Sequence, residues 1–198
     1  MSKQLIVSVS REYGAGGHDI ADKIAKHFGL KLYDSNLLTE VADAQQVAYE
    51  NLQKYDEKPR NVLWARKVLD EYNSNEDITA NAEFDYMKKK AEEGESMVVV
   101  GRCSDAVFKG HPGLVSIFVT ANIEKRVSHI MEKYGLSKRE AEEKCVQMDK
   151  QRKQYHDSHT DAKWGETKYY DICINSSKLG LQHTADILIS YIEKFLAE

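Results

Sequence analysis

Five short apolar runs alternate along the chain with longer segments of helical periodicity. The runs cover residues 5–10, 30–34, 97–100, 114–119 and 170–174. A short run that is apolar on both faces is typical of a strand buried in a parallel sheet. Strands that alternate with helices predict a sheet covered by helices on both sides. The pattern therefore predicts a three-layer α/β/α fold around a five-stranded parallel sheet.

Apolar residues three and four positions apart predict the helices. One stripe covers residues 20–28 and ends at Gly29, and another covers 123–134 and ends at Gly135. Glycine commonly closes a helix because it adopts the left-handed conformation without strain. A last stripe over 181–195 predicts a C-terminal helix.

Two further regions follow less regular patterns. Ser137 and Glu140 form a capping-box pair that opens a long helix, which we expect to continue through Tyr155. The polar stretch 156–168 behind it is predicted to be a loop. Residues 36–94 carry several helical stripes and no strand pattern, so we expect a helical region there.

Composition restricts the classes of function. The net charge of −4 argues against a broad nucleic-acid surface. No apolar run approaches the roughly 20 residues that cross a bilayer, and the N-terminus lacks a signal-peptide core. Three widely separated cysteines without a CxxC pair fit reduced thiols. We therefore expect a cytoplasmic protein that binds neither membrane nor nucleic acid.

Polar residues follow directly after three of the predicted strands. They are Arg11, Asp34 and Arg102. In open parallel sheets, ligands bind at the carboxyl ends of the strands. We therefore expect these three side chains to converge on one ligand site.

A glycine-rich turn joins the first strand to the first helix. Its residues are Tyr13, Gly14, Ala15, Gly16, Gly17 and His18. Small residues expose backbone N–H groups, and a helix N-terminus adds the positive end of its dipole. The turn is thus predicted to bind a phosphate. The alternative is a plain connection, but four small residues in a row favour the anion site.

The turn lacks two residues of a standard phosphate loop. That loop carries Lys and then Ser or Thr after its last glycine, whereas this chain has Gly17 and His18. Arg11 lies on the same turn, and its forked guanidinium suits phosphate oxygens, so we expect it to replace the lysine. The alternative is a surface ion pair with Glu12. His18 either donates a hydrogen bond to the phosphate or is simply solvated.

The order and spacing of several motifs resemble the cytidylate kinase-like branch of the P-loop nucleoside monophosphate kinases. The matching segments are the altered phosphate loop Ser10–Gly17, the strand end Leu32–Asp34, the Gly-Arg turn Val99–Arg102, the fourth strand and lid start Ile117–Arg126, the lid return arm Asp149–Tyr155 and the fifth strand Tyr170–Ser176. Two departures stand out. Cys103 occupies the place of an Asp, and His129 and Ile130 replace lid arginines.

The resemblance implies an activity and a domain plan. It implies ATP as phosphoryl donor, Mg2+ as cofactor and a nucleoside monophosphate, CMP or dCMP, as acceptor. It also implies a single domain over residues 1–198, with a core of 1–35 and 95–198. Residues 36–94 would then form the acceptor-binding region, and residues 136–168 the lid.

The same resemblance implies roles for particular residues. Asp34 and Arg102 would bind the acceptor, although Asp34 also suits a helix cap. Arg126 and Arg152 would close over the nucleotide phosphates, although most helix arginines are only solvated. The oxygen ligands left for magnesium are a separate pair, Asp149 and Asp105.

Three functions remain open from the sequence. The first is the nucleotide kinase. The second is a nucleotide- or phosphate-binding regulatory module that kept the fold without catalysis, which the missing lysine, Ser/Thr and Asp favour. The third is a kinase for another small acceptor, because residues 36–93 carry no readable code for a base.

Overall fold

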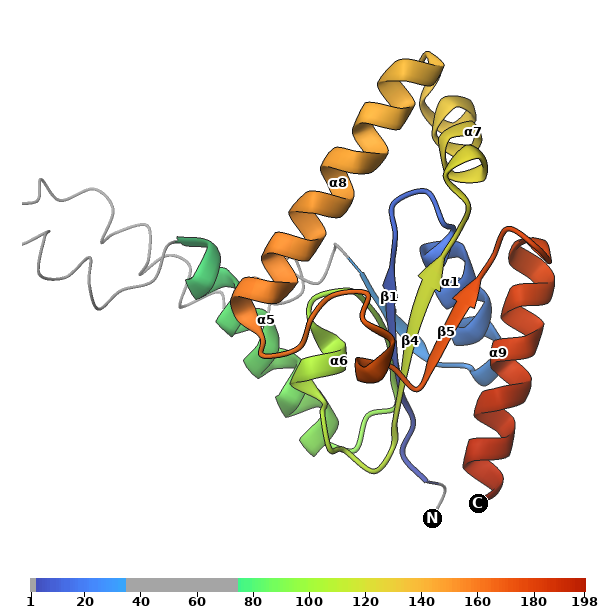
Figure 1. The fold of residues 1–198 in the computed structure, drawn as a ribbon. Coiled ribbons are helices and arrows are strands. Elements are labelled where there is room, and N and C mark those ends of the chain that lie inside the picture. The colour runs from blue at the N-terminus through green and yellow to red at the C-terminus, as the bar shows by residue number, and fades with distance from the viewer. Residues whose placement is uncertain (1–2, 35–74) are drawn as a thin grey trace, which may run out of the picture.

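The computed structural model describes residues 3–34 and 75–198, which form a parallel sheet with helices on both faces (Figure 1). The strands are β1 (Ile6–Arg11), β2 (Lys31–Tyr33), β3 (Met97–Val100), β4 (Leu114–Thr120) and β5 (Ile172–Asn175). Their order across the sheet is β2-β3-β1-β4-β5, and every neighbouring pair is parallel. The predicted fold class is confirmed.

The described helices are α1 (Gly17–Phe28), α5 (Asn75–Glu92), α6 (Ser104–Val107), α7 (Ile123–Tyr134), α8 (Lys138–His159) and α9 (Gly180–Ala197), with one 3-10 turn at Thr167–Tyr169. They follow the predicted stripes, except for the short helix α6 and the 3-10 turn, which were not predicted from the sequence. Gly29 and Gly135 close α1 and α7 in the left-handed conformation, as predicted. Of the predicted helical region, α5 lies among the described residues, and 36–74 lies outside them.

The central strand β1 divides the core into two halves. Val7 and Val9 are fully buried in a cluster with residues of α1 and α9. Ile6 points to the opposite face, where it packs with Met97 of β3 and Met87 of α5. Side chains alternate along a strand, so an uninterrupted apolar run supplies both faces. This burial holds the carboxyl end of β1 in the middle of the sheet.

Helices α7 and α8 form a pair that rises beyond the carboxyl ends of the strands (Figure 1). The predicted capping box is present, since Ser137 and Glu140 exchange side chain-to-backbone hydrogen bonds. Within the described residues, no helix is long and apolar enough to cross a membrane.

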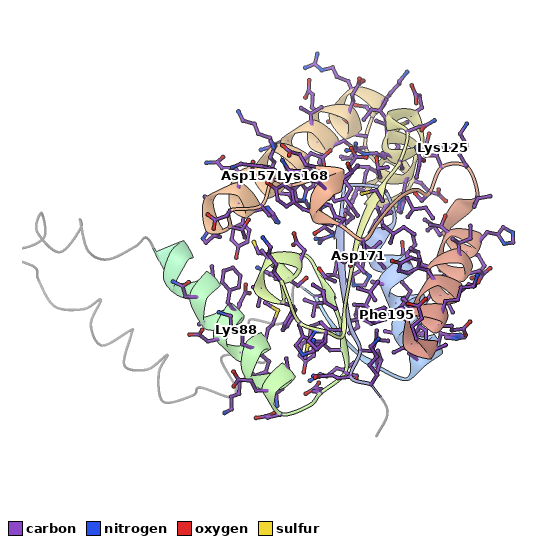
Figure 2. All side chains as sticks on the ribbon, turned by 60° about the horizontal axis from the view of Figure 1, so that its bottom comes forward. Lys88, Lys125, Asp157, Lys168, Asp171 and Phe195 are labelled. Atoms are coloured by element: carbon purple, nitrogen blue, oxygen red, sulfur yellow. The ribbon has the colours of Figure 1, made fainter. Side chains whose placement is uncertain are left out.

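Two predicted boundaries were wrong. Helix α8 continues to His159, because His156 is buried against Asp105 and the Thr160 hydroxyl donates to the His156 carbonyl at 2.9 Å. Strand β5 begins at Ile172 and not at residue 170. The residue before it, Asp171 (Figure 2), is held by Ser116, whose N–H and hydroxyl both donate to its carboxylate at 2.7 Å.

Two isoleucines of α9 test the contribution of the core. Ile192 is fully buried and Ile187 is 44% exposed. We expect Ile192→Ala to lower the free energy of unfolding by about 2–5 kcal/mol, because it removes methyl groups and leaves a cavity. Ile187→Ala on the same helix is the matched control and should change it little. Equal losses in urea unfolding would contradict this packing.

Candidate phosphate-binding site

The turn between β1 and α1 lies at the switch point of the sheet. The chain leaves β1 toward β2 on one side, and it crosses from β3 to β4 on the other. Ligands of open parallel sheets bind in the crevice that this change of direction creates. The glycine-rich turn, which follows Arg11, is therefore placed where the fold admits a ligand.

The backbone of the turn leaves several N–H groups available. Gly14 and Gly16 have φ angles of 81° and 76°, a region that residues with a Cβ rarely adopt. Within residues 3–34 and 75–198, the N–H groups of Gly14, Gly16 and Gly17 donate to no acceptor. They lie at the start of a twelve-residue helix, where backbone N–H groups and the helix dipole attract anions.

A buried arginine holds the turn in this shape. Arg126 on α7 is 6% exposed, and its Nε donates to the Tyr13 carbonyl at 2.7 Å. Its terminal nitrogens pair with Asp149 and, at 3.3 Å, with Glu12. Asp149 in turn accepts a hydrogen bond from the Tyr13 N–H at 2.7 Å. Tyr13 is thus fixed through both of its backbone groups.

These contacts change the roles expected from the sequence. Arg126 was predicted to close over the nucleotide phosphates. In the structure, its three guanidinium nitrogens already contact the Tyr13 carbonyl, Glu12 and Asp149. Both oxygens of Asp149, a predicted magnesium ligand, are engaged. Glu12, the alternative partner of Arg11, accepts hydrogen bonds from the Thr120 hydroxyl and the Ala121 N–H.

Three other arginines gather beside the turn. Arg152 on α8 donates to the Arg11 carbonyl at 3.0 Å, and its guanidinium lies 5.2 Å from the centre of the Tyr13 ring. Burial, together with repulsion from Arg152 and Arg102, lowers the pKa of Arg11 to about 9, against a smaller attraction from Asp34. Arg11 therefore carries its charge at neutral pH at a cost, which a bound anion offsets.

Arg102 belongs to an unusual turn after β3. Gly101, Arg102 and Cys103 have φ angles of 76°, 57° and 53°, so two residues with side chains adopt the left-handed conformation. Such strain concentrates at functional sites, where the surrounding structure must hold it. The Arg102 guanidinium pairs with Glu83 of α5 at 3.2 Å. Tyr155 of α8 also contacts it, and burial raises the pKa of that phenol to about 12.

No role was assigned to Tyr155 from the sequence, and Glu83 was not singled out. Glu83 lies in a polar helix with no motif around it, yet it is fully buried, and desolvation raises its pKa against the attraction of Arg102. Tyr155 carried a usable signal, because it follows Arg152 by three positions and shares its face of α8.

Asp34 is joined to the turn through His18. The His18 Nε2 and an Asp34 carboxylate oxygen are 2.9 Å apart. The contact ties the end of β2 to the first turn of α1. Arg11 at the end of β1, Asp34 directly after β2 and Arg102 in the turn after β3 therefore lie together at the carboxyl ends of the strands, close enough for Asp34 and Arg102 to act on the charge of Arg11.

The two predicted magnesium ligands do not form a metal site. Asp105 is buried, and one of its oxygens is 2.8 Å from the His156 Nε2. Asp149 is held by Arg126 and Tyr13, as described above. Among residues 3–34 and 75–198, no group of three or more His, Cys, Asp or Glu side chains is placed to hold a metal ion. The described side chains do not fit a magnesium site built by the protein.

Cys103 is a packing residue and not a reactive thiol in this structure. Its side chain is 2% exposed. Burial and the neighbouring charges of Asp105 and Glu83 raise its pKa to about 12, so the thiol is protonated at neutral pH. Nucleophilic cysteines need the thiolate form.

The fold and site agree with the comparison to known families. The model of the cytidylate kinase-like family matches residues 6–178. This chain belongs to the cytidylate kinase-like family. The match includes β1, the glycine-rich turn, the turn after β3, and α8 with Arg152.

Two curated relatives of this chain are distant from it in sequence. Cytidylate kinase of Pyrococcus horikoshii is 24% identical, over 88% of this chain and 81% of that protein. Cytidylate kinase of Staphylothermus marinus is 22% identical, over 98% of this chain and 99% of that protein.

Solved structures support the same fold. An uncharacterized protein from Eubacterium ventriosum superposes with a TM-score of 0.77 at 31% identity, covering 96% of this chain and 99% of its own. Shikimate kinase from Bacteroides thetaiotaomicron reaches a TM-score of 0.54 at 11% identity, covering 96% and 98% of the two chains, which shows the fold alone.

The ion pairs of Arg126 provide a first test of the site. Arg126→Met keeps most of the side-chain volume and leaves Asp149 and Glu12 without their cation. We expect a loss of about 3–5 kcal/mol in the free energy of unfolding, because breaking a buried pair strands a charge. Arg139→Met, which removes an exposed pair with Glu143 on α8, is the control and should change little. If Arg126→Met lowered the free energy of unfolding no more than Arg139→Met does, the stability of the turn would not depend on Arg126.

The raised pKa of Glu83 gives a second test, measured as unfolding free energy against pH. A carboxyl whose native pKa is raised binds more protons in the folded state, so its contribution to stability falls as pH rises above its ordinary pKa. Wild-type stability relative to Glu83→Gln should therefore decline from about pH 4.5 toward neutral pH.

An exposed glutamate supplies a control of opposite sign. A hydrogen bond from Lys90 lowers the pKa of Glu93, so its contribution is lost as pH falls below its ordinary pKa of 4.5. Wild-type stability relative to Glu93→Gln should thus rise with pH in the acid range. If the difference in unfolding free energy between the wild type and Glu83→Gln did not change between about pH 4.5 and 7, the raised pKa of the buried Glu83 carboxyl would be contradicted.

Proposed function

We propose that this protein is an ATP-dependent kinase that transfers the γ-phosphoryl group to a nucleoside monophosphate, with CMP and dCMP as the first candidates. The observation that carries the proposal is the gathering of Arg11, Arg102 and Arg152 beside unpaired N–H groups of the turn. Phosphoryl transfer needs positioning and positive charge around the transferred group and little covalent chemistry from the protein.

In this proposal the donor phosphates lie over the turn. The N–H groups of Gly14, Gly16 and Gly17 donate to phosphate oxygens, and Arg11 supplies the neighbouring cation. Arg152 orients the Tyr13 side of the turn and adds positive charge. A bound triphosphate would offset the repulsion among these guanidinium groups, so the charge that is unfavourable in the free protein becomes binding energy.

The acceptor phosphate is assigned to Arg102. This arginine is held in place by the left-handed turn and by Glu83 and Tyr155. Asp34 lies on the same edge and suits the hydroxyl or amino groups of an acceptor. Two distant relatives bear the name cytidylate kinase, which supports a pyrimidine monophosphate as acceptor.

Magnesium is not assigned to a side chain. The carboxylates predicted to bind it are engaged elsewhere, and magnesium commonly reaches kinases through the phosphates of the nucleotide. We infer a cytoplasmic location from the free thiols of the three cysteines.

A second candidate function is a nucleotide-binding module without turnover. The engagement of Asp149 and Asp105 favours it, as does the absence of a lysine at position 17. Calorimetry separates the two candidates, because a module binds ATP without releasing ADP when monophosphates are added.

The kinase is tested by coupled ADP release from Mg2+ and ATP with a panel of nucleoside monophosphates. We expect ADP release to depend on the monophosphate and to be fastest with a cytidine or deoxycytidine acceptor. The Arg11→Ala, Arg102→Ala double variant should abolish it. Full activity of that variant would overturn the assigned roles, and nucleotide binding without turnover would favour the module.

Of the three arginines, Arg102 is the one that we expect to bind the acceptor, and a single substitution tests this role. Arg102→Met should raise the KM for the monophosphate about tenfold to a hundredfold, since a charge-assisted hydrogen bond contributes roughly 1.5–3 kcal/mol. The KM for ATP should change much less. Arg139→Met removes a surface guanidinium and should leave both values as in the wild type. An effect of Arg102→Met confined to ATP would place this arginine on the donor side.

A further inference from the structure

Arg11 and Gly17 occupy two positions at which the standard phosphate-loop pattern has a glycine and a lysine, but in the opposite order. The standard pattern is G-x-x-x-x-G-K-[ST], in which the first glycine stands six positions before the lysine. With Gly16 as the second glycine, the first glycine falls at position 11 and the lysine at position 17. This chain has the cation at the first place and glycine at the second.

The structure shows why the residue at position 17 is glycine. A Cβ built there would lie 2.5 Å from the Cβ and 2.7 Å from the Cγ of Arg11, closer than real side chains approach. Gly17 does not have a positive φ, so backbone conformation does not demand glycine. The Arg11 stem occupies the space that a side chain at position 17 would need.

The other end of the Arg11 side chain lies against the turn after β3. A Cβ on Gly101 would collide with the Arg11 Nη1. The side chain therefore spans the distance from the donor turn, at Gly17, to the turn that carries Arg102. The Arg11 side chain thus lies between the two turns to which the proposed function assigns the donor and the acceptor.

We propose that Arg11 takes the place of the phosphate-loop lysine by a reciprocal exchange, in which a cation at position 11 requires glycine at position 17. Its guanidinium binds the phosphoryl group being transferred. This inference rests on the proposed function for the identity of the ligand. Its packing component, the mutual exclusion of side chains at positions 11 and 17, stands on the structure alone.

The packing component is tested by thermal unfolding without nucleotide. Gly17→Ala adds one methyl group at a helix start, where alanine is normally favoured over glycine. We nevertheless expect it to lower Tm by about 2–10 °C, because the methyl group overlaps Arg11. In the Arg11→Gly background the same substitution should leave Tm unchanged or raise it. Equal effects in both backgrounds would overturn the exclusion.

The binding component is tested by calorimetry with ATP and with tripolyphosphate. Arg11→Met keeps most of the stem and removes the charge, and we expect it to weaken both ligands at least about tenfold. Arg11→Lys should lose less than Arg11→Met. Arg139→Met controls for the loss of one positive charge and should bind as the wild type does.

The exchange itself is tested by moving the cation back. Gly17→Lys alone should unfold at lower temperature, whereas Arg11→Gly with Gly17→Lys should fold and recover most of the ATP affinity lost in Arg11→Gly. Affinity no better than that of Arg11→Gly would overturn the reciprocal exchange. Unaltered affinity of Arg11→Met for both ligands would overturn the phosphate role of Arg11 in a chain that folds normally.

The outcomes also separate this inference from the proposed function. If the wild type binds tripolyphosphate but not ATP, the kinase proposal fails, and Arg11→Met is then judged on tripolyphosphate. If the wild type binds neither ligand, both the kinase and the phosphate role of Arg11 are overturned. If the wild type binds ATP and Arg11→Met binds it equally well, only the role of Arg11 fails.

Discussion

Positive charge that neighbouring carboxylates compensate only in part, at the carboxyl ends of the strands, is the feature on which the site depends. Arg11, Arg102 and Arg152 come from three separate elements, and their proximity lowers the pKa of Arg11. The neighbouring carboxylates of Asp34 and Glu83 do not remove the cost of keeping Arg11 charged. A protein keeps such a cluster against its own stability where an anion completes it. Phosphate is the anion that we propose for it, because the chain belongs to the cytidylate kinase-like family and the cluster lies at the switch point of the sheet.

The arginines of this region divide into two kinds according to their partners. Arg126 is enclosed by Glu12, Asp149 and the backbone of Tyr13, and this network shapes the turn. The Arg11 side chain extends from Gly17 of the same turn to Gly101, and it lies close enough to Arg102 and Arg152 to be repelled by them. The first arrangement supplies rigidity, and the second supplies attraction for a ligand. A preorganised turn would lose less entropy on binding the proposed phosphate, so the two arrangements support one another.

The departures from a standard phosphate loop acquire a physical explanation in three dimensions. Gly17 stands where a lysine is expected, but the space beside it is filled by the stem of Arg11. His18 replaces a hydroxyl residue and contacts Asp34, which ties β2 to the turn. The carboxylates left for magnesium are both engaged, Asp149 with Arg126 and Asp105 with His156. The chain therefore keeps the fold of its family, while the residues of the turn differ from those of a standard phosphate loop.

The sequence by itself determined the layers, the parallel sheet, most helix limits and the turn, because burial periodicity and glycine placement are local properties. It also indicated that Arg11, Asp34 and Arg102 converge, since parallel strands end at one edge. Only the tertiary structure decided which charges meet. The enclosure of Arg126 and the burial of Glu83 depend on contacts between residues far apart in the chain, and no local pattern reports the desolvation and Coulomb forces that such contacts create.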